Sequence, residues 1–154
     1  SPRMRFDLLL QEFLRDALID KKISIFGADF WRPLINVNDM ADACQKTIES
    51  DSDLISSQIF NVGDDSENYT KRQLAEIIKE FLPSVEIDIV ESKQDPRNYK
   101  VSFEKIKTIL NFQAKRSVRE SVEEILSEIN SGKLNPTESE FSNMSKMTQN
   151  VSVY

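Results

Sequence analysis

The stretch that decides the fold lies near the start of the chain and reads Phe26-Gly27-Ala28-Asp29-Phe30-Trp31-Arg32-Pro33-Leu34-Ile35-Asn36-Val37-Asn38-Asp39-Met40. It contains the end of a short apolar strand, a glycine turn, one arginine among apolar neighbours, a second apolar run and the start of a helix. A guanidinium matches the geometry of a phosphate or carboxylate, and apolar neighbours strengthen that contact by excluding water. We therefore expect Arg32 to be a functional residue that binds an anion.

Length and composition describe one soluble globular domain. The 154 residues suffice for a real core, and 39% hydrophobic with 30% charged residues is typical of soluble proteins. No apolar run is long enough to cross a bilayer, and no signal peptide is visible, which predicts a cytoplasmic protein without a membrane partner. A chain that opens on Ser1 instead of methionine suggests a fragment or a processed protein.

Charge and missing residue types exclude several kinds of chemistry. The net charge of −6 argues against nucleic acid as a partner, because binding it needs a basic face. The chain has no histidine, which excludes histidine triads and the usual zinc sites, and we predict no metal site. Cys44 is the single cysteine, so it cannot form an intramolecular disulfide. Its helical context predicts a small buried residue.

Helices and strands are predicted to alternate along the chain. Apolar side chains recur at helical spacing over 6–20, and start signals predict further helices over about 39–50, 70–82, 102–110 and 117–131. Thr70 with Gln73, and Ser117 with Glu120, form capping boxes. Strands are predicted at 23–26, 58–62 and 85–90. These strands are too few for a complete doubly wound sheet.

The periodic pattern ends at the C-terminal side. We predict one domain over 1–132 and a disordered tail over 133–154, which is rich in Ser, Thr and Asn. The apolar residues Phe141, Met144, Met147 and Val151 leave open that part of this tail docks on another surface. The three glycines, Gly27, Gly63 and Gly132, form neither a dinucleotide fingerprint nor a P-loop, so no cofactor-binding residue is predicted.

Five motifs in order resemble the C-terminal half of the extended short-chain dehydrogenases/reductases, the NAD-dependent sugar-nucleotide epimerases and dehydratases. The resemblance covers about residues 1–130. Its motifs are the entry Ser1-Pro2-Arg3-Met4-Arg5-Phe6-Asp7-Leu8, the block Phe26–Asp39, Phe60-Asn61-Val62-Gly63, the segment Asp95-Pro96-Arg97-Asn98-Tyr99 with Ser102 and Lys105, and Asn111-Phe112. The implied fold class is α/β, a partial Rossmann-type C-terminal portion with a small mixed α/β substrate-binding subdomain.

The resemblance implies a binding site for a nucleoside diphosphate sugar. By position, Arg32 matches the arginine that binds the diphosphate, and Tyr99 matches a tyrosine at the substrate. The other implied site residues are Asp7 and Leu8 beside the nucleotide, Ser24 and Phe26 framing the base through their backbone, Asn61 at the pocket, and Arg97 as a second phosphate contact.

Several positions depart from the family pattern. Ser92 stands where the family often has an arginine, Asn36 replaces a histidine, and Ser102 replaces an aspartate. Asp7 replaces an asparagine, and a negative charge near a phosphate is unfavourable unless Arg3 or Arg5 offsets it. These changes leave the identity of the sugar nucleotide open.

The family's N-terminal half carries the NAD or NADP loop and a Tyr-x-x-x-Lys pair, and neither motif occurs in this chain. The expected function is therefore the nucleotide-sugar-binding portion of an isomerase or lyase. No catalytic residue is predicted here, and the chain alone is expected to be inactive. The N-terminal Rossmann half is the expected partner, and a homodimer is left open. The alternative is a non-catalytic sugar-nucleotide-binding or scaffolding protein derived from the family.

Structural roles stay open beside these functional ones. Arg32 could be a salt-bridge partner, Arg97 a solvated loop residue, and Tyr99 a packing aromatic with a satisfied hydroxyl. Trp31 could line a core or pocket wall, or it could stack on a base.

Overall fold

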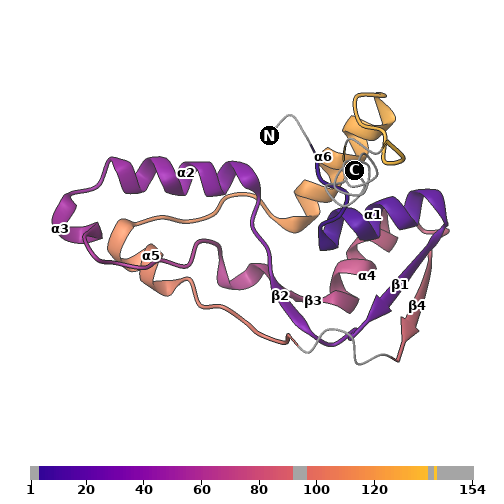
Figure 1. The fold of residues 1–154 in the computed structure, drawn as a ribbon, viewed down its shortest axis with the longest axis horizontal. Coiled ribbons are helices and arrows are strands. Elements are labelled where there is room, and N and C mark those ends of the chain that lie inside the picture. The colour runs from indigo at the N-terminus through magenta and orange to yellow at the C-terminus, as the bar shows by residue number, and fades with distance from the viewer. Residues whose placement is uncertain (1–3, 92–96, 139–140, 142–154) are drawn as a thin grey trace, which may run out of the picture.

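The computed structural model describes residues 4–91, 97–138 and 141. Figure 1 shows a body from which an arm extends. The body contains α1 (Leu9–Ile19), β1 (Lys22–Phe26), α4 (Lys71–Phe81), β4 (Glu86–Val90) and α6 (Val118–Asn130). The arm contains α2 (Val37–Ile48), α3 (Ser52–Ile55), the segment 56–64 and α5 (Glu104–Leu110). The strands β2 (Trp31–Pro33) and β3 (Asn68–Thr70), with the 3-10 helix η1 (Asp65–Glu67) before β3, lie between body and arm.

The body is held together by one core on a two-stranded parallel sheet. β1 pairs with β4 in a register that runs from Lys22 opposite Glu86 to Phe26 opposite Val90. The alternating side chains of β1 place Ile23 and Ile25 in the core, both fully buried, against α1 and α4. The periodic apolar residues predicted from the sequence thus form the buried core of the body. The combination of helices with a parallel sheet confirms the predicted α/β class.

The helix starts of the body follow their predicted caps. Thr70 and Gln73 form a reciprocal capping box at α4, as do Ser117 and Glu120 at α6. Each box satisfies backbone N–H groups that have no partner within the helix. All five predicted helices and two of the three predicted strands are present with shifted ends. The short elements α3, β2 and β3 are ones that the sequence pattern did not indicate.

The arm has a core of its own, and it depends on a glycine. Its buried residues are Ala43, Phe103, Ile106, Leu110 and Phe112. A Cβ atom at Gly63 would lie 2.7 Å from the ring of Phe103, so no larger residue fits there without displacing the ring. The glycine of the Phe-Asn-Val-Gly motif is therefore required by packing in the arm.

Two predictions for the arm are wrong. The predicted strand 58–62 forms no strand in the described part of the chain. No other described strand lies beside it to complete a ladder, although Phe60 and Val62 pack on the arm core. Cys44 is exposed, not buried, because α2 turns the neighbouring Ala43 toward that core.

The tail departs from the expected disorder at Phe141. Its side chain is buried, and its ring meets that of Phe6 edge to face at a centroid distance of 6.1 Å. The backbone N–H of Phe6 donates to the carbonyl of Phe141 at 2.8 Å. Residues 139–140 and 142–154 lie outside the described residues, and with them the prediction for the rest of the tail. Within the part that is described, no helix is long and apolar enough to span a membrane.

A buried carboxylate ties the arm to the body. Asp39, in the first turn of α2, is 1% exposed. It accepts hydrogen bonds from the backbone N–H of Arg116 at 2.9 Å and from Nη1 of the same arginine at 2.6 Å. Asp42 lies 3.5 Å from that guanidinium and is half-exposed. Asp39 therefore fixes α2 against the segment that enters α6.

We expect Asp39→Asn to lower the free energy of unfolding by about 2 kcal/mol, because charge-assisted hydrogen bonds to a buried acceptor weaken. The matched control, Asp42→Asn, removes a half-exposed carboxylate and should change the free energy of unfolding by less than about 0.5 kcal/mol. Urea denaturation followed by circular dichroism measures both. Equal losses for the two variants would contradict a special role for Asp39.

Candidate functional site

Arg32 lies at the centre of the junction between body and arm. It is the middle residue of β2 and stands opposite Tyr69 of β3. Its Nη1 donates to the carbonyl of Trp31 at 2.7 Å and to the carbonyl of Arg97 at 2.6 Å. Its Cζ lies 5.5 Å from the ring centroid of Tyr99, within the range of a cation–π contact. The structure thus joins Arg32, Arg97 and Tyr99 through direct contacts.

Two asparagines fasten the segment 97–101 to this hairpin. The backbone N–H of Trp31 donates to Oδ1 of Asn98 at 2.9 Å. Asn68 donates from Nδ2 to the carbonyl of Val101 and accepts from the N–H of Val101, both at 3.0 Å. The side-chain amide of Asn68 thus pairs with both backbone groups of Val101, as the backbone of a neighbouring strand would. The segment that bears Tyr99 is therefore held at both ends.

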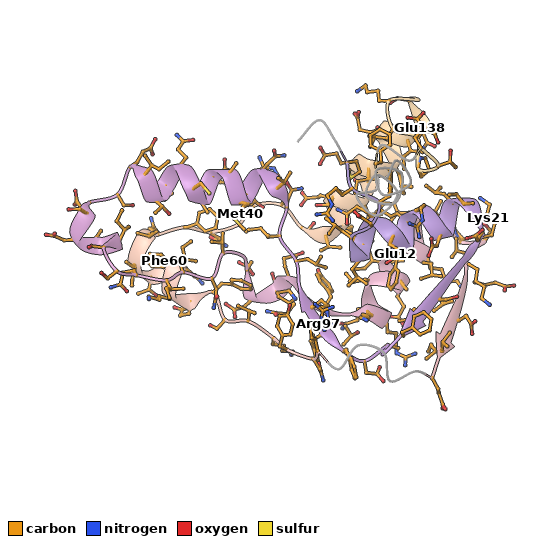
Figure 2. The ribbon with its side chains drawn as sticks, in the orientation of Figure 1. Glu12, Lys21, Met40, Phe60, Arg97 and Glu138 are labelled. Carbon is orange, nitrogen blue, oxygen red and sulfur yellow. The ribbon has the colours of Figure 1, made fainter. Side chains whose placement is uncertain are left out.

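Basic side chains gather at this place. Nζ of Lys100 lies 3.5 Å from the ring centroid of Trp31. Arg32 and Arg97 belong to the same cluster, and Figure 2 shows Arg97 beside the β2–β3 hairpin. We call Trp31, Arg32, Arg97, Tyr99 and Lys100 the Arg32 cluster. Since the whole chain has a net charge of −6, this concentration of cations indicates a site for an anion.

The other five predicted site residues lie on separate elements. Asp7 and Leu8 precede α1, and Asp7 forms an ion pair with Nε of Arg5 at 3.0 Å. Arg5 is thus one of the two arginines expected to offset this charge, while Arg3 lies outside the described residues. Leu8 stands at the N-cap of α1 and is exposed.

Ser24 and Phe26 lie on β1, and Asn61 lies in the arm. Ser24 stands opposite Asp88 of β4. The carbonyl of Phe26 accepts a hydrogen bond at 2.9 Å from Nζ of Lys71, a lysine that is 7% exposed. Asn61 donates to the carbonyl of Ser102 at 3.3 Å, which links the segment 56–64 to the start of α5.

Several residues at the site escaped prediction. These residues are Asn68, Lys71, Asn98 and Lys100. Their contacts depend on which loops lie side by side in the fold, and no periodic pattern in the sequence indicates that. For Asn98 the one signal was its place within the quoted motif beside Tyr99. Two residues of the same motif region, Ser92 and Asp95, lie outside the described residues.

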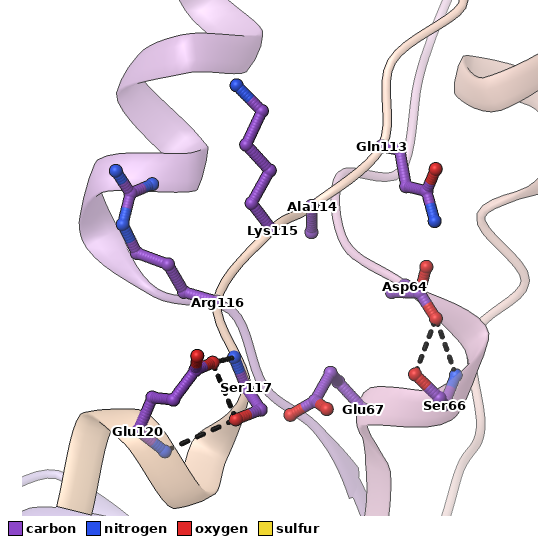
Figure 3. A pocket seen from close by; sticks show the side chains of 9 residues that line it. All are labelled: Asp64, Ser66, Glu67, Gln113, Ala114, Lys115, Arg116, Ser117 and Glu120. Carbon is purple, nitrogen blue, oxygen red and sulfur yellow. Dashed lines mark hydrogen bonds between the residues drawn. The ribbon is translucent and has the colours of Figure 1, made fainter. Parts of the chain in front are cut away.

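A separate cavity of about 220 Å³ opens between η1 and the start of α6 (Figure 3). Its charged lining residues are Asp64, Glu67, Lys115, Arg116 and Glu120. None of the eight predicted site residues lines it. The lining has three carboxylates and two cations, and Arg116 is held by Asp39, so the cavity lacks the excess of positive charge found at the Arg32 cluster.

The carboxylates of this cavity are committed to nearby donors. Asp64 accepts from the backbone N–H and the hydroxyl of Ser66, which lowers the pKa of Asp64. Glu67 accepts from the N–H of Val118 at 2.8 Å, but burial is the largest effect on it and raises its pKa. These groups support the start of α6 and the turn before β3. We therefore take the Arg32 cluster as the candidate site.

Comparison with curated proteins finds relatives of greater length. UDP-glucuronic acid decarboxylase 5 of Arabidopsis thaliana is 31% identical over 127 residues, which are 79% of this chain and 36% of that protein. UDP-glucuronic acid decarboxylase 6 of the same plant is 30% identical over the same shares. The chain thus spans little more than a third of the length of these relatives. No family model matches the chain.

Solved structures share the fold over most of this chain. Pal from Bacillus thuringiensis superposes with a TM-score of 0.66 and 26% identity, over 80% of this chain and 39% of that one. L-threonine dehydrogenase from Phytophthora infestans has a TM-score of 0.69 at 19% identity, over 80% and 41%. An ADP-L-glycero-D-manno-heptose-6-epimerase from Helicobacter pylori gives 0.64 at 17% identity, over 80% and 37%. The last two likenesses establish the fold alone.

Glu67 generates a prediction on pH. Its pKa in the folded state is raised above the ordinary value of 4.5, so between the two values the folded chain binds more protons than the unfolded chain. The contribution of Glu67 to stability should therefore fall as the pH rises from 4.5 through the raised pKa. Glu67→Gln should remove this part of the pH dependence, measured by urea denaturation across that range. Glu76→Gln, at an exposed site on α4, is the control. A dependence that survives Glu67→Gln would contradict the assignment.

Proposed function

Because the chain matches the C-terminal portion of the extended short-chain dehydrogenase/reductase family, a Rossmann-type fold, we propose that it binds the nucleoside diphosphate sugar in an NAD(P)-dependent enzyme of nucleotide-sugar metabolism. The curated relatives bear the names of enzymes that act on UDP-glucuronic acid. The proposed substrate class for this chain is broader, any nucleoside diphosphate sugar. The proposed reaction of the complete enzyme is an epimerisation, a dehydration, a reduction or a decarboxylation.

The Arg32 cluster is the observation that carries this proposal. The diphosphate of such a substrate is the most charged part of the molecule, and a guanidinium can bind it with two parallel hydrogen bonds. Arg32 lies against Tyr99, and the backbone of Arg97 fixes its direction. A side chain that is already held in place loses little conformational entropy when a ligand binds. We assign Arg32 to the diphosphate, Arg97 to a second phosphate contact, and Tyr99 to the sugar side.

The remaining proposed contacts belong to the nucleotide. Ser24 and Phe26 border the base at the edge of β1, and Asp7 and Leu8 lie beside the ribose and phosphate. The ion pair between Arg5 and Asp7 supports this placement, because it neutralises a carboxylate that would otherwise repel a phosphate. Asn61 lines the pocket on the arm side. Under this proposal no residue of this chain transfers a proton or a hydride.

The proposed cofactor of the complete enzyme is NAD or NADP, which would supply the hydride chemistry. The part of the family outside the matched region would bind it, and that Rossmann portion is the proposed partner. The proposed compartment is the cytoplasm. A non-catalytic sugar-nucleotide binder remains the second candidate, and the changed motif position Asn36 supports it. Asn36 caps α2 by accepting from the backbone N–H of Asn38, and it donates to the hydroxyl of Ser121 at 2.9 Å. Both contacts hold the start of α2 in place.

We expect Arg32→Ala to weaken the binding of UDP-glucose by about 10- to 150-fold, the loss of one charged contact worth about 1.5–3 kcal/mol. Isothermal titration calorimetry measures this on the full chain, alone and mixed with the cofactor-binding portion of a relative. Arg32→Lys should recover only part of the affinity, because an ammonium cannot bind in two parallel bonds.

The matched control is Arg119→Ala. Arg119 is an exposed arginine whose guanidinium pairs with Glu80 on α4, away from the Arg32 cluster. Its loss should leave the affinity unchanged. Binding by the chain alone would favour the non-catalytic binder, and binding only in the mixture would favour the enzyme portion. Equal affinity of wild type and Arg32→Ala would contradict the proposed site.

A further inference from the structure

The segment that follows α6 runs back to the start of the described chain. Phe141 is buried at its end, and its ring meets the ring of Phe6 edge to face. The backbone N–H of Phe6 donates to the carbonyl of Phe141 at 2.8 Å. Neither ring belongs to the core of the body or to the arm core, so the pair is an apolar contact of its own. We call residues 132–138 together with Phe141 the strap.

Hydrogen bonds define the path of the strap. The N–H of Leu134 donates to a carbonyl in the last turn of α6 at 3.2 Å. Oδ1 of Asn135 accepts from the backbone N–H and the hydroxyl of Thr137, at 3.1 and 2.7 Å. The N–H of Phe141 donates at 3.2 Å to the carbonyl of Glu138, the strap residue labelled in Figure 2. The strap therefore links α6 to Phe141 through successive hydrogen bonds.

The segment that the strap holds precedes α1. The carbonyl of Phe6 accepts from Nη1 of Arg15 at 3.2 Å, so both backbone groups of Phe6 are paired, one with α1 and one with the strap. Asp7 and Leu8 follow directly. Leu8 stands at the N-cap of α1 and makes no side-chain cap, unlike the residues at the starts of α4 and α6. The contacts of Phe6 therefore fix the chain where it enters α1.

We propose that Phe141 is a positioning residue for the bound nucleotide, which acts through Phe6 by fixing the backbone of Asp7 and Leu8. This inference rests on the proposed function, in which these two residues lie beside the ribose and phosphate. A segment that is ordered before the ligand arrives loses less conformational entropy on binding. The strap and the nucleotide should therefore stabilise each other, since both favour the ordered form of the same segment.

Hydrogen exchange tests whether the strap orders this segment. In the full chain without ligand, Phe141→Ala removes the ring but keeps the backbone carbonyl. The amide of Phe6 should then exchange about tenfold faster, because its acceptor is in place less often. Mass spectrometry of the N-terminal peptide measures this rate, and amides in the middle of α4 should keep theirs. The matched control is Lys133→Ala, which removes an exposed strap residue that pairs with Glu128 at 2.9 Å and should leave the rate at Phe6 unchanged.

Binding tests whether this order serves the nucleotide. If the ordered form falls to about a tenth of the population, Phe141→Ala should bind UDP-glucose about tenfold more weakly. Inorganic pyrophosphate lacks the nucleoside, so this variant should weaken its binding less, whereas Arg32→Ala should weaken both ligands. Phe141→Leu should recover part of the affinity for UDP-glucose, since it refills the apolar space without the ring edge. Calorimetry uses the sample, chain alone or mixed, in which the wild type binds UDP-glucose, and circular dichroism confirms that each variant is folded.

Three outcomes would overturn this inference alone. Unchanged exchange at Phe6 in Phe141→Ala would show that the strap does not order the segment. Faster exchange with unchanged affinity for UDP-glucose would show that the order does not serve the nucleotide. Equal losses for UDP-glucose and pyrophosphate would indicate a general loosening of the site. A wild type that binds UDP-glucose in neither sample would instead overturn the proposed function, and this inference with it.

Discussion

The pairing of β2 with β3 is the constraint on which the site depends. Three residues on each strand connect body and arm, with Arg32 opposite Tyr69. Such a short ladder contributes few hydrogen bonds, and two strands alone are marginal in water. Asn68 and Asn98 extend it by pairing with the segment 97–101 on either side of Tyr99. Arg32 is thus positioned by loop contacts more than by a large sheet.

The body and the main helices could be predicted from the sequence, because long periodic patterns encode one buried face. The capping boxes at Thr70 and Ser117 placed two helix starts correctly. The strands β2 and β3 could not be predicted, since three residues are too few for an alternating pattern to be visible. Cys44 was placed inside because a helix with two apolar faces has no unique buried side in sequence.

The candidate site was predictable in part. Resemblance placed Arg32, Arg97 and Tyr99 in one site, and their contacts in the structure are direct. An arginine near Asp7 was expected because the resemblance implies a phosphate beside this carboxylate, and the two negative charges would repel each other without a cation. Asn68 and Lys71 were missed because their partners, Val101 and Phe26, are backbone groups distant in sequence. Any residue type can supply a backbone carbonyl or N–H, so the sequence does not indicate such a partner.

The contact between Phe6 and Phe141 connects opposite ends of the described chain. Closing so long a loop costs conformational entropy before any contact is gained, and one ring pair with one backbone hydrogen bond repays little of that cost. The contact between Phe6 and Phe141 should therefore form late during folding and be among the first to open in local unfolding. Asp7 and Leu8 follow Phe6 directly, so the order of their backbone depends on a contact with a residue that is synthesised long after them.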